Sequence, residues 1–572
     1  MTRYRGLAVL RVIVVMVACA LPALAQEPNQ SPGSRIPVIQ DWTHRHVIFG
    51  GGGSAAARAA ATPDPRAWHE WLIRNQHLLS AGQNSKGKKP GGSQGIDIDW
   101  AVSLGTAGVA AGSFPAKYSF DVTAAPSCTT DFVVFPIAAA TASASQANII
   151  AFHNLYANSV GTGFCTGTTA TVRWAYYVGT GPVKTSPVLS LTGTKVAFIE
   201  SLPATSGAVF RVLTPVTGQG TSATVAVAPG SGGSSVTSLS YTPAGGLCAG
   251  PGLATNTKSS PFVDYTNDVA YVGADNGYLY KITGVFNGTP AVAGCALVTA
   301  SATLTSPVYD GVLGRVFISD GTNLVSFDAN LGSKTTLSPA PSVAGGIADA
   351  PIVDVTNGFA YLFTTSNGTN AVAVQVPYSG LTTFGTATSL SIGGTGGNAL
   401  HLGIFDNAYF TTGPKSGAGS LYACGNQGSG QQPAKKPGLY RFAFTSGSGA
   451  MATTTFSNDL NVGSSTGECS PLTSFYNAAL AKEYLFLGHT GGQNVEMWDI
   501  TTALTNTTTT YTASTGTTVY NGGTSGIIVD GQGSCTDCSN IYFGTLTAGT
   551  QSLNRCGKSN FCAVKLTQGL LQ

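Results

Sequence analysis

Short apolar runs recur along this chain in a fixed order. The clearest copy has a Ser-Pro dipeptide leading into an apolar run at 260–264, a second run at 268–273 and a third at 277–282. Each run is rich in β-branched and aromatic residues and is bounded by Gly, Asn, Asp or Pro, which is the pattern of short β-strands. The pattern therefore predicts a unit of successive antiparallel strands that is repeated along the chain.

Seven further copies of this unit can be recognised. Copies open at Phe114, Ser186, Ser306, Ala350 and Ser470, each followed by Pro, and more degenerate ones open at His401 and Ser525. A three-stranded meander followed by a fourth strand is the unit of a β-propeller blade. We therefore predict an all-β fold, a single β-propeller of eight blades, or of seven if one weak copy is an insertion. A pair of β-sandwiches would explain the strands but not their repeated order.

The two ends of the repeat region complement each other. The last copy ends with a third strand at 561–567 and lacks an outer strand. Residues 97–105 resemble the outer strand 172–179 of the first copy, including a Trp in each. We expect 97–105 to pair with 561–567, which would close the ring and remove an open sheet edge.

The first residues have the features of a signal peptide. Basic residues precede an apolar run at 12–21, and small residues precede a cleavage site after Ala25. The run is too short to span a membrane. We expect a secreted or periplasmic protein, without a lipid anchor at Cys19 because the residues before it match a lipobox poorly. The predicted parts are a signal peptide (1–25), a low-complexity extension with one short helix at 64–79 (26–95) and the propeller (96–572).

Composition narrows the possible partners. Charged residues make up only 9% of the chain, the net charge is +3, and the mean hydropathy is +0.16. There is no basic patch, so we expect no nucleic acid partner. Beyond the signal peptide the apolar residues form only short runs, so we expect no transmembrane segment, and we expect a monomer.

Ten cysteines remain after removal of the signal peptide. An even number in an exported chain predicts disulfides. Neighbours in sequence suggest three pairs and a group of four: Cys128 with Cys165, Cys248 with Cys295, Cys424 with Cys469, and Cys535, Cys538, Cys556 and Cys562. We expect two disulfides in the group of four, and a four-thiolate zinc site is the alternative.

No motif for a nucleophile, a P-loop, a zinc protease or an EF-hand occurs in the sequence. His44 and His46 flank Arg45 and could form a metal pair, but two ligands are weak evidence and a solvated surface explains them better. We therefore predict no metal site.

One set of residues occupies equivalent positions in different blades. When the copies are aligned on their Pro, five ionisable residues fall within two residues of the start of an inner strand: Lys184, Lys258, Asp349, His401 and Glu468. Such a ring at the channel mouth could bind a polar or anionic ligand, or supply an acid and a base. Alternatively, these groups pair with one another. If they form a site, their side chains converge on one cavity.

Several blade motifs recur in known propellers. They are the S-P-x-x-D motif, the Y-V-G turn, the strand at 278–282 and the outer-strand Trp174. On these motifs the region 96–572 resembles exported bacterial propellers with pyrroloquinoline-quinone-like and YVTN-type repeats. The quinoprotein docking motif D-x-x-T-G-x-x-x-W survives only as a fragment at 328–332, so the resemblance implies no cofactor and carries over no catalytic residue.

The sequence leaves two classes of function open. The first is an exported binding or scaffold protein that recognises a glycan, a peptide or an envelope protein at one face of the ring. The second is a lyase, a hydrolase or a quinone-dependent oxidoreductase that acts at the channel mouth. His401 within hydrogen-bond reach of Asp349 or Glu468 in an open cavity would favour the enzyme, and a channel filled by apolar side chains would favour binding.

Overall fold

The computed structural model separates residues 1–34 from residues 35–572, which form one compact unit. The predicted signal peptide and Cys19 lie outside the residues that the structure describes. The described residues are 36–50, 64–74, 96–122, 124–202, 207–240, 257–337, 346–395, 398–427, 436–459, 467–477, 480–490, 495–504, 512–513, 522–531, 538–549, 556–557 and 559–568. In this part of the chain, no helix is both long enough and apolar enough to cross a membrane.

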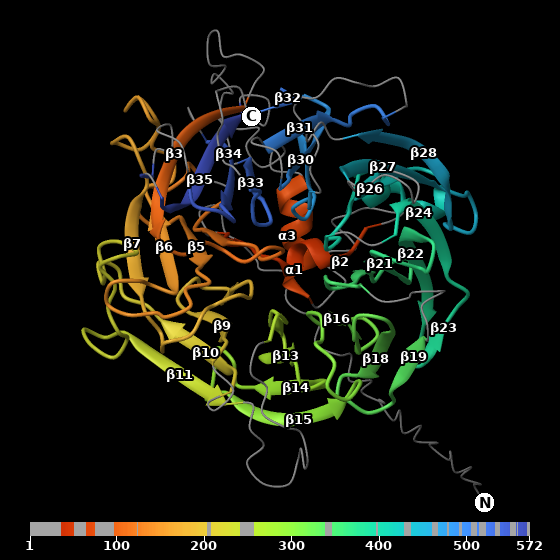
Figure 1. Ribbon diagram of the computed structural model, residues 1–572, viewed down its shortest axis with the longest axis horizontal. Coiled ribbons are helices and arrows are strands. Elements are labelled where there is room, and N and C mark those ends of the chain that lie inside the picture. The colour runs from red at the N-terminus through yellow and green to blue at the C-terminus, as the bar shows by residue number, and fades with distance from the viewer. Residues whose placement is uncertain are drawn as a thin grey trace, which may run out of the picture. The chain divides into compact units, whose positions relative to one another are not determined.

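The described strands form seven hydrogen-bonded sheets that follow one another around a common centre (Figure 1). Most neighbouring strands are antiparallel and consecutive in sequence, so the fold is a β-propeller, as the repeats predict. The ten-stranded sheet consists of two antiparallel groups that are joined by one bridge between Gly393 and Asn426. Eight blades, with these two groups counted separately, stay a prediction.

The first four sheets use the N-terminal half of the repeat region. Their strands are β1 (Val38–Gln40), β4 (Ala116–Ser119), β5 (Phe132–Pro136), β6 (Ile149–His153) and β7 (Thr171–Tyr176); β8 (Val188–Leu189), β9 (Val196–Glu200), β10 (Val209–Thr214) and β11 (Ser235–Ser240); β12 (Phe262–Asp264), β13 (Val269–Gly273), β14 (Tyr278–Thr283) and β15 (Ala291–Leu297); and β16 (Val308–Asp310), β17 (Arg315–Ser319), β18 (Leu324–Asp328) and β19 (Thr335–Leu337).

The other three sheets contain the remaining strands. These are β2 (Val47–Ile48), β20 (Ile352–Asp354), β21 (Phe359–Thr364), β22 (Asn370–Ser379), β23 (Thr383–Phe384), β24 (Thr388–Gly394), β25 (Ile404–Phe405), β26 (Ser420–Gln427), β27 (Lys436–Phe444) and β28 (Met451–Asp459); β29 (Thr473–Asn477), β30 (Lys482–Gly488), β31 (Val495–Asp499) and β32 (Thr512–Ala513); and β33 (Ile528–Gly531), β34 (Ser539–Gly544), β35 (Phe561–Gln568) and β3 (Ile96–Gly105). The helices are α1 (Thr43–His46), α3 (Pro65–Arg74), α5 (Asn407–Thr412) and the 3-10 turn η2 (Pro414–Ser416).

The Asp of the repeated motif closes the turn after the inner strand. A carboxylate oxygen of Asp310 accepts the backbone N–H groups of Val312 (2.9 Å) and Leu313 (3.1 Å). Asp264 and Asp354 make the same pair of contacts two and three residues further on. This side-chain turn is a local property of Asp, which explains why the residue recurs in the repeat.

The Ser of the motif links neighbouring sheets near the channel. The Ser186 hydroxyl accepts the N–H of Phe114 at 2.9 Å, and the Ser260 hydroxyl accepts the N–H of Ser186 at 2.8 Å. The Ser306 hydroxyl then accepts the N–H of Ser260 at 2.7 Å. These buried hydroxyls satisfy backbone donors where the inner strands begin.

The predicted pairing of the two ends is confirmed. Strand β3 pairs antiparallel with β35, from Ile96 opposite Gln568 to Gly105 opposite Phe561. Trp100 of β3 is buried, and its indole N–H donates to the Leu155 carbonyl of the first sheet at 3.1 Å. A fully buried ion pair between Lys117 of β4 and Asp530 of β33, at 3.1 Å, also joins the first and last sheets.

The N-terminal extension contributes more to the propeller than the sequence predicts. Strand β1 pairs antiparallel with β4, and β2 pairs in parallel with β20, so the segment that includes α1 runs between two inner strands. The extension is therefore not only a low-complexity segment with one helix. The predicted helix at 64–79 is present as α3 (Pro65–Arg74), and residues 75–79 lie outside the described residues.

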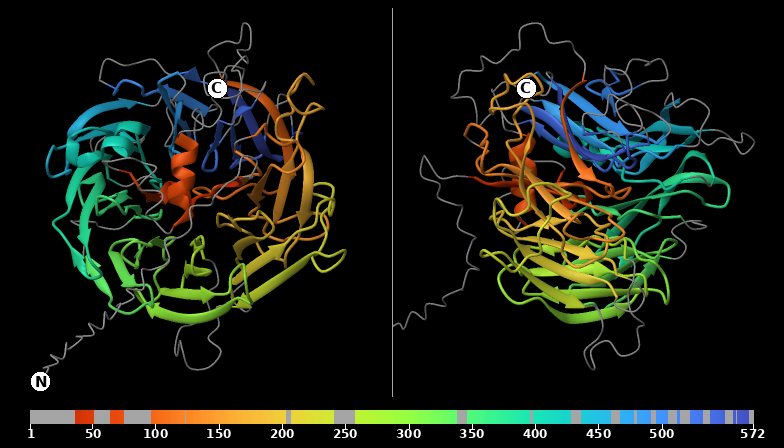
Figure 2. Two further views of the ribbon diagram at one scale, coloured as in Figure 1. Left: turned by 180° about the vertical axis from the view of Figure 1, so that it is seen from behind. Right: turned by 60° about the vertical axis from the view of Figure 1, so that its left-hand side comes forward.

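This segment and α3 occupy the centre of the ring in both face views (Figures 1 and 2). Trp42 is 2% exposed, packs edge-on against Phe262, and donates its indole N–H to the Pro261 carbonyl at 3.1 Å. The buried Arg66 guanidinium of α3 lies 4.4 Å from the Phe262 ring centroid and donates to the Val263 carbonyl at 2.5 Å. The extension docks on its own propeller through the core rather than through surface contacts.

The cysteine predictions hold where the structure describes both partners. Cys128–Cys165 and Cys424–Cys469 are disulfides, as predicted. Cys556 bonds to Cys562, which favours disulfides over a shared zinc ion in the group of four. Cys295 and Cys538 are also disulfide-bonded, whereas Cys248 and Cys535 lie outside the described residues.

Candidate functional site

Three of the five predicted site residues come together where inner strands begin. Asp349 precedes β20, His401 precedes β25, and Glu468 precedes β29. The His401 Nε2 atom lies 2.7 Å from a Glu468 carboxylate oxygen, and its Nδ1 atom lies 3.6 Å from an Asp349 carboxylate oxygen. One imidazole therefore lies between two carboxylates.

The two predicted lysines do not join this group. Lys184 is half-buried before β8, and Lys258 is exposed before β12. Among the described residues, neither lysine forms a hydrogen bond or an ion pair with His401, Asp349 or Glu468. The expected five-residue ring is therefore a three-residue group, and aligned sequence positions were not enough to place long, flexible lysine side chains.

A fourth member of the group comes from the N-terminal extension. His46 is 1% exposed at the end of α1, and its Nε2 atom lies 3.5 Å from the second Asp349 oxygen. Its Nδ1 atom donates to the Trp42 carbonyl at 2.9 Å, because a carbonyl can only accept. The interpretation of His46 as a solvated surface residue is wrong. The apolar residues at 38–39 and 47–49, which resemble blade strands, were the available signal for its burial.

We call His46, Asp349, His401 and Glu468 the His401 network, and the backbone holds its acids in place. The two Asp349 oxygens accept the N–H groups of Ala350 at 2.8 Å and Leu402 at 3.0 Å. Glu468 donates its N–H to the Thr490 hydroxyl at 2.6 Å. Backbone N–H groups thus orient the Asp349 carboxylate toward the two histidines.

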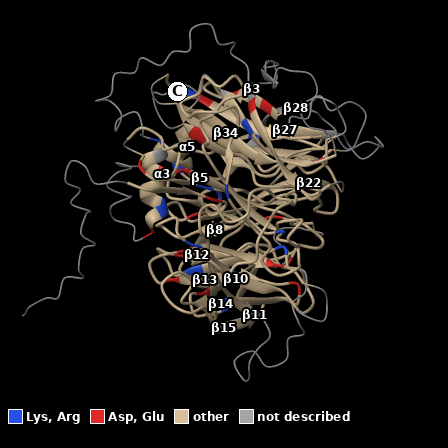
Figure 3. Cartoon of the chain, turned by 90° about the vertical axis from the view of Figure 1, so that its left-hand side faces the viewer, with Lys and Arg blue, Asp and Glu red and all other residues tan. Residues whose placement is uncertain are grey.

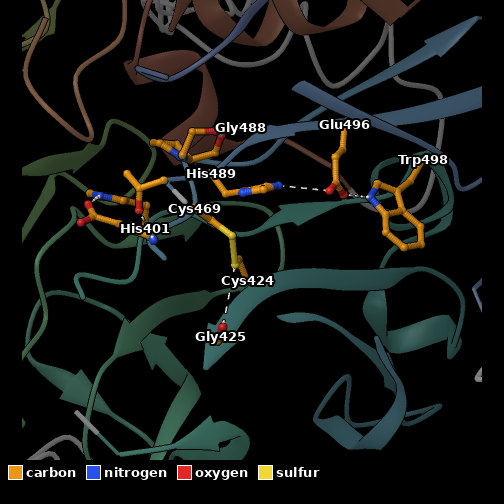
Figure 4. Close-up of a disulfide and its surroundings, with 12 residues drawn as sticks. His401, Cys424, Gly425, Cys469, Gly488, His489, Glu496 and Trp498 are labelled. Atoms are coloured by element: carbon orange, nitrogen blue, oxygen red, sulfur yellow. Dashed lines mark hydrogen bonds and ion pairs between the residues drawn. A yellow bond between two sulfur atoms is a disulfide. The ribbon is translucent and has the colours of Figure 1, made fainter. Parts of the chain in front are cut away.

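A disulfide and a glycine fix the surroundings of His401. Cys469, next to Glu468, is bonded to Cys424 of β26 (Figure 4). On the other side, a Cβ atom at Gly112 would lie 2.7 Å from the His401 Cε1 atom, and Gly112 has a φ of +74°. Only glycine tolerates both this backbone conformation and this close approach.

The electrostatics of the network favour charged side chains. Burial alone would lower the pKa of His401, but the hydrogen bonds and charges of Asp349 and Glu468 raise it to about 9. Burial alone would raise the pKa of Asp349, but the hydrogen bonds and charges of His401 and His46 hold it well below its usual range. At neutral pH the network therefore contains an imidazolium that is paired with carboxylates.

A second buried histidine lies nearby (Figure 4). His489 pairs antiparallel with Cys469 in an isolated bridge, and its Nε2 atom lies 3.1 Å from a Glu496 oxygen. The other Glu496 oxygen accepts the indole N–H of Trp498 at 3.1 Å. All three side chains are buried, so this pair belongs to the core of its sheet.

A cavity lies beside α1 and α3, and we call it the Arg45 cavity. It is lined by the N-terminal extension on one side and by inner strands on the other. Its volume is about 60 Å³, which is room for a few water molecules and far below the roughly 300 Å³ of a small-molecule site. Its ionisable lining residues are Asp41, His44, Arg45, Arg66, Glu70 and Arg74, and apolar residues such as Phe114, Ile404 and Phe410 complete it. Apart from His44, considered as half of a metal pair, no sequence pattern singles out these residues.

The chemistry of the His401 network is therefore limited. A general base must hold a free lone pair within reach of a substrate proton, but the His401 imidazole is protonated at neutral pH and only 9% exposed. Among the described residues, no three His, Cys, Asp or Glu side chains are arranged to hold a metal ion. The protonation and burial of His401 therefore argue against its use as a general base.

Comparison with known proteins finds similarity only in structure. No family model matches the chain, and no curated protein matches it. BamB from Moraxella catarrhalis aligns over 82% of this chain and 97% of its own, with 10% identity and a TM-score of 0.39. Sqt1 from Saccharomyces cerevisiae aligns over 82% and 98%, with 10% identity and a TM-score of 0.46. Sqt1 from Chaetomium thermophilum, bound to the N-terminus of the ribosomal protein L10, aligns over 78% and 97%, with 12% identity and a TM-score of 0.44.

Proposed function

We propose that the protein is an exported β-propeller that binds a partner at one face of the ring and does not itself catalyse a reaction. The carrying observation is that the chain's own extension fills the channel mouth. Trp42 and His46 are buried there, and Phe114 packs edge-on against the His46 ring. A substrate in the channel would have to displace this core.

The faces of the ring remain available for a partner. A glycan, a peptide or an envelope protein fits this arrangement, since each can bind across loops without entering the channel. A hydrolase, a lyase or a quinone-dependent oxidoreductase at the mouth is disfavoured, because His401 is paired with Glu468 in a buried network rather than in an open cavity.

Export is part of this proposal, and the disulfides support it. Cytosolic thiols are kept reduced, so several disulfides in one chain fit an oxidising compartment. Thiol titration of the denatured, unreduced mature protein should find essentially no free thiols, and its mass should correspond to a chain that begins at Gln26. Four thiols released by a chelator would restore the zinc alternative, and an uncleaved chain would argue against export.

Binding can be tested directly with the purified mature protein. Thermal unfolding would be followed with panels of glycans, peptides, metal ions and quinones, because a ligand that binds only the folded state raises the melting temperature. We expect a saturable shift with a glycan or a peptide, and recovery of that compound unchanged by mass spectrometry. Turnover of any panel compound would overturn the proposal in favour of the enzyme.

A further inference from the structure

The cavity beside α1 and α3 carries an excess of basic side chains. His44 and Arg45 of α1 and Arg74 of α3 line it together, and Figure 3 shows basic residues on α3. The chain as a whole has only 9% charged residues. Three basic side chains on a cavity of about 60 Å³ therefore call for a physical explanation.

The acidic residues of the lining are already engaged. Asp41 accepts the N–H of Thr43 at 2.9 Å and its hydroxyl at 2.6 Å, and the same oxygen lies 3.1 Å from the His44 Nδ1 atom. Glu70 accepts the Phe49 N–H at 3.4 Å. Arg66, the remaining base of the lining, is paired with Asp64 outside the cavity at 3.0 Å.

The other two guanidinium groups lack such a partner. Among the described residues, neither Arg45 nor Arg74 forms an ion pair with a carboxylate. Within the described part of the chain, Arg45 donates to the Ser474 carbonyl at the long distance of 3.5 Å. Arg74 lies over the Phe410 ring at 3.4 Å and donates to the Asn407 side-chain oxygen at 3.2 Å. Glu70 attracts both guanidinium groups, and Glu483 and Asp406 attract Arg74, but none of these carboxylates lies within ion-pair distance of them.

Two nitrogen atoms of the lining are buried without a hydrogen-bond partner among the residues that the structure describes. They are the Nε atom of Arg74 and the Nε2 atom of His44, whose side chain is 8% exposed. Burial and the charge of Arg74 together lower the pKa of Arg45 to about 10, against the opposing effect of the Glu70 carboxylate. Unsatisfied donors and mutual repulsion are both costly in a buried site, and an anion between them would remove both costs.

We propose that this cavity binds an oxyanion of the size of a carboxylate or a phosphate group. Arg45 and Arg74 are the anchors, and the His44 Nε2 atom is a third contact. The volume of about 60 Å³ suits such a group and excludes a larger molecule, so a larger ligand would place only its anionic end here. The site does not depend on the proposed scaffold function, because it would bind a free anion as well.

The test uses the full mature protein with inorganic phosphate, acetate and chloride at matched ionic strength. Thermal unfolding and titration calorimetry should show saturable binding of phosphate or acetate and none of chloride. A tighter response to phosphate identifies a phosphate-bearing ligand, and a tighter response to acetate identifies a carboxylate. Equal shifts with all three anions would reflect general screening and would overturn the proposal.

Variants locate the binding in the cavity. Arg45→Gln and Arg74→Gln should each weaken the affinity by about tenfold or more, because each removes charge-assisted hydrogen bonds. Arg173→Gln is the matched control, since Arg173 also lies over an aromatic ring (Phe132, 4.9 Å) and donates to a carbonyl (Thr129, 2.5 Å) outside the cavity. It should bind like the unmodified protein.

A conservative variant controls for loss of binding that is caused by misfolding. Arg45→Lys keeps the charge but loses the planar donor pair, so it should bind with an affinity between those of the unmodified protein and Arg45→Gln. Undiminished binding in Arg45→Gln and Arg74→Gln, or equal loss in Arg173→Gln, would overturn the assignment. If the cavity binds no oxyanion, the partner-binding proposal is unaffected, because the glycan and peptide panels test that proposal separately.

Discussion

The His401 network and the Arg45 cavity both involve the N-terminal extension, yet they treat charge in opposite ways. In the network, His401 lies between two carboxylates and His46 faces one of them. In the cavity, the charge of Arg74 repels that of Arg45, and Glu70 attracts both, without an ion pair among the described residues. Paired buried charges stabilise a fold, whereas unpaired ones lower its stability until a ligand binds. The four expectations that follow test this contrast.

The largest expected effect comes from removing the centre of the network. His401→Ala leaves Asp349 and Glu468 without their shared cation, and loss of one partner of a buried ion pair costs about 3–5 kcal/mol. Denaturant unfolding at pH 6 should show this loss in the free energy of unfolding. A loss below about 1 kcal/mol, the range of surface pairs, would mean that the network does not stabilise the fold.

The second effect is a pH dependence that His401 should cause. Its pKa is raised from 6.5 to about 9 in the folded state, so its contribution is fully present below pH 6.5 and is lost as the pH rises through 9. The difference corresponds to about 3 kcal/mol. Other groups also titrate, including Glu483, whose pKa burial raises to about 8. The measurement is therefore the difference between the unmodified protein and His401→Gln from pH 6 to 10. Parallel stability curves would contradict the assignment.

A smaller effect is expected in the cavity. Arg45→Gln removes a desolvated charge that Arg74 repels. In a buffer without oxyanions, the free energy of unfolding should therefore stay the same or rise, by no more than about 1 kcal/mol. Differential scanning calorimetry in a chloride buffer would measure it. A loss as large as that of His401→Ala would show that Arg45 is structural, and the contrast between the two regions would disappear.

The smallest change in stability is expected at an exposed ion pair, which provides the reference for the buried groups. Lys482 and Asp499 form an exposed pair at 3.0 Å, with side chains 45% and 46% exposed. Because solvent screens such a pair, Lys482→Ala should cost less than about 1 kcal/mol. The same unfolding assay would check it, and 1 M salt should abolish the difference. A salt-independent loss of several kcal/mol would point to a packing role of the lysine stem instead.

The repeats were predictable because their causes are local. The Asp of the motif makes its own turn, as Asp310 does with Val312 and Leu313, so it leaves a regular trace in the sequence. The pairing of β3 with β35 was also predictable, since one copy lacked an outer strand and a matching strand lay elsewhere. The convergence of Asp349, His401 and Glu468 followed from their equivalent positions before inner strands.

Other side-chain positions could not be predicted, because no local sequence pattern marks them. Lys184 and Lys258 occupy equivalent positions too. The orientation of a long side chain, however, depends on its interaction partners, and neighbouring sheets determine which partners are within reach. His46 and Arg45 lie in a segment without the repeat pattern. Their partners, Asp349 and Ser474, are hundreds of residues away in sequence.

The sequence by itself determined the all-β class, the order of strands in each repeat and the pairing of Cys128 with Cys165 and of Cys424 with Cys469. These depend on local propensities and on neighbours in the chain. Only the tertiary structure decided that the extension fills the channel mouth, that His401 is paired and that Arg45 and Arg74 share a cavity. The physical reason is that the charge state and the availability of a side chain depend on burial and on distant partners, which exist only once the sheets have assembled.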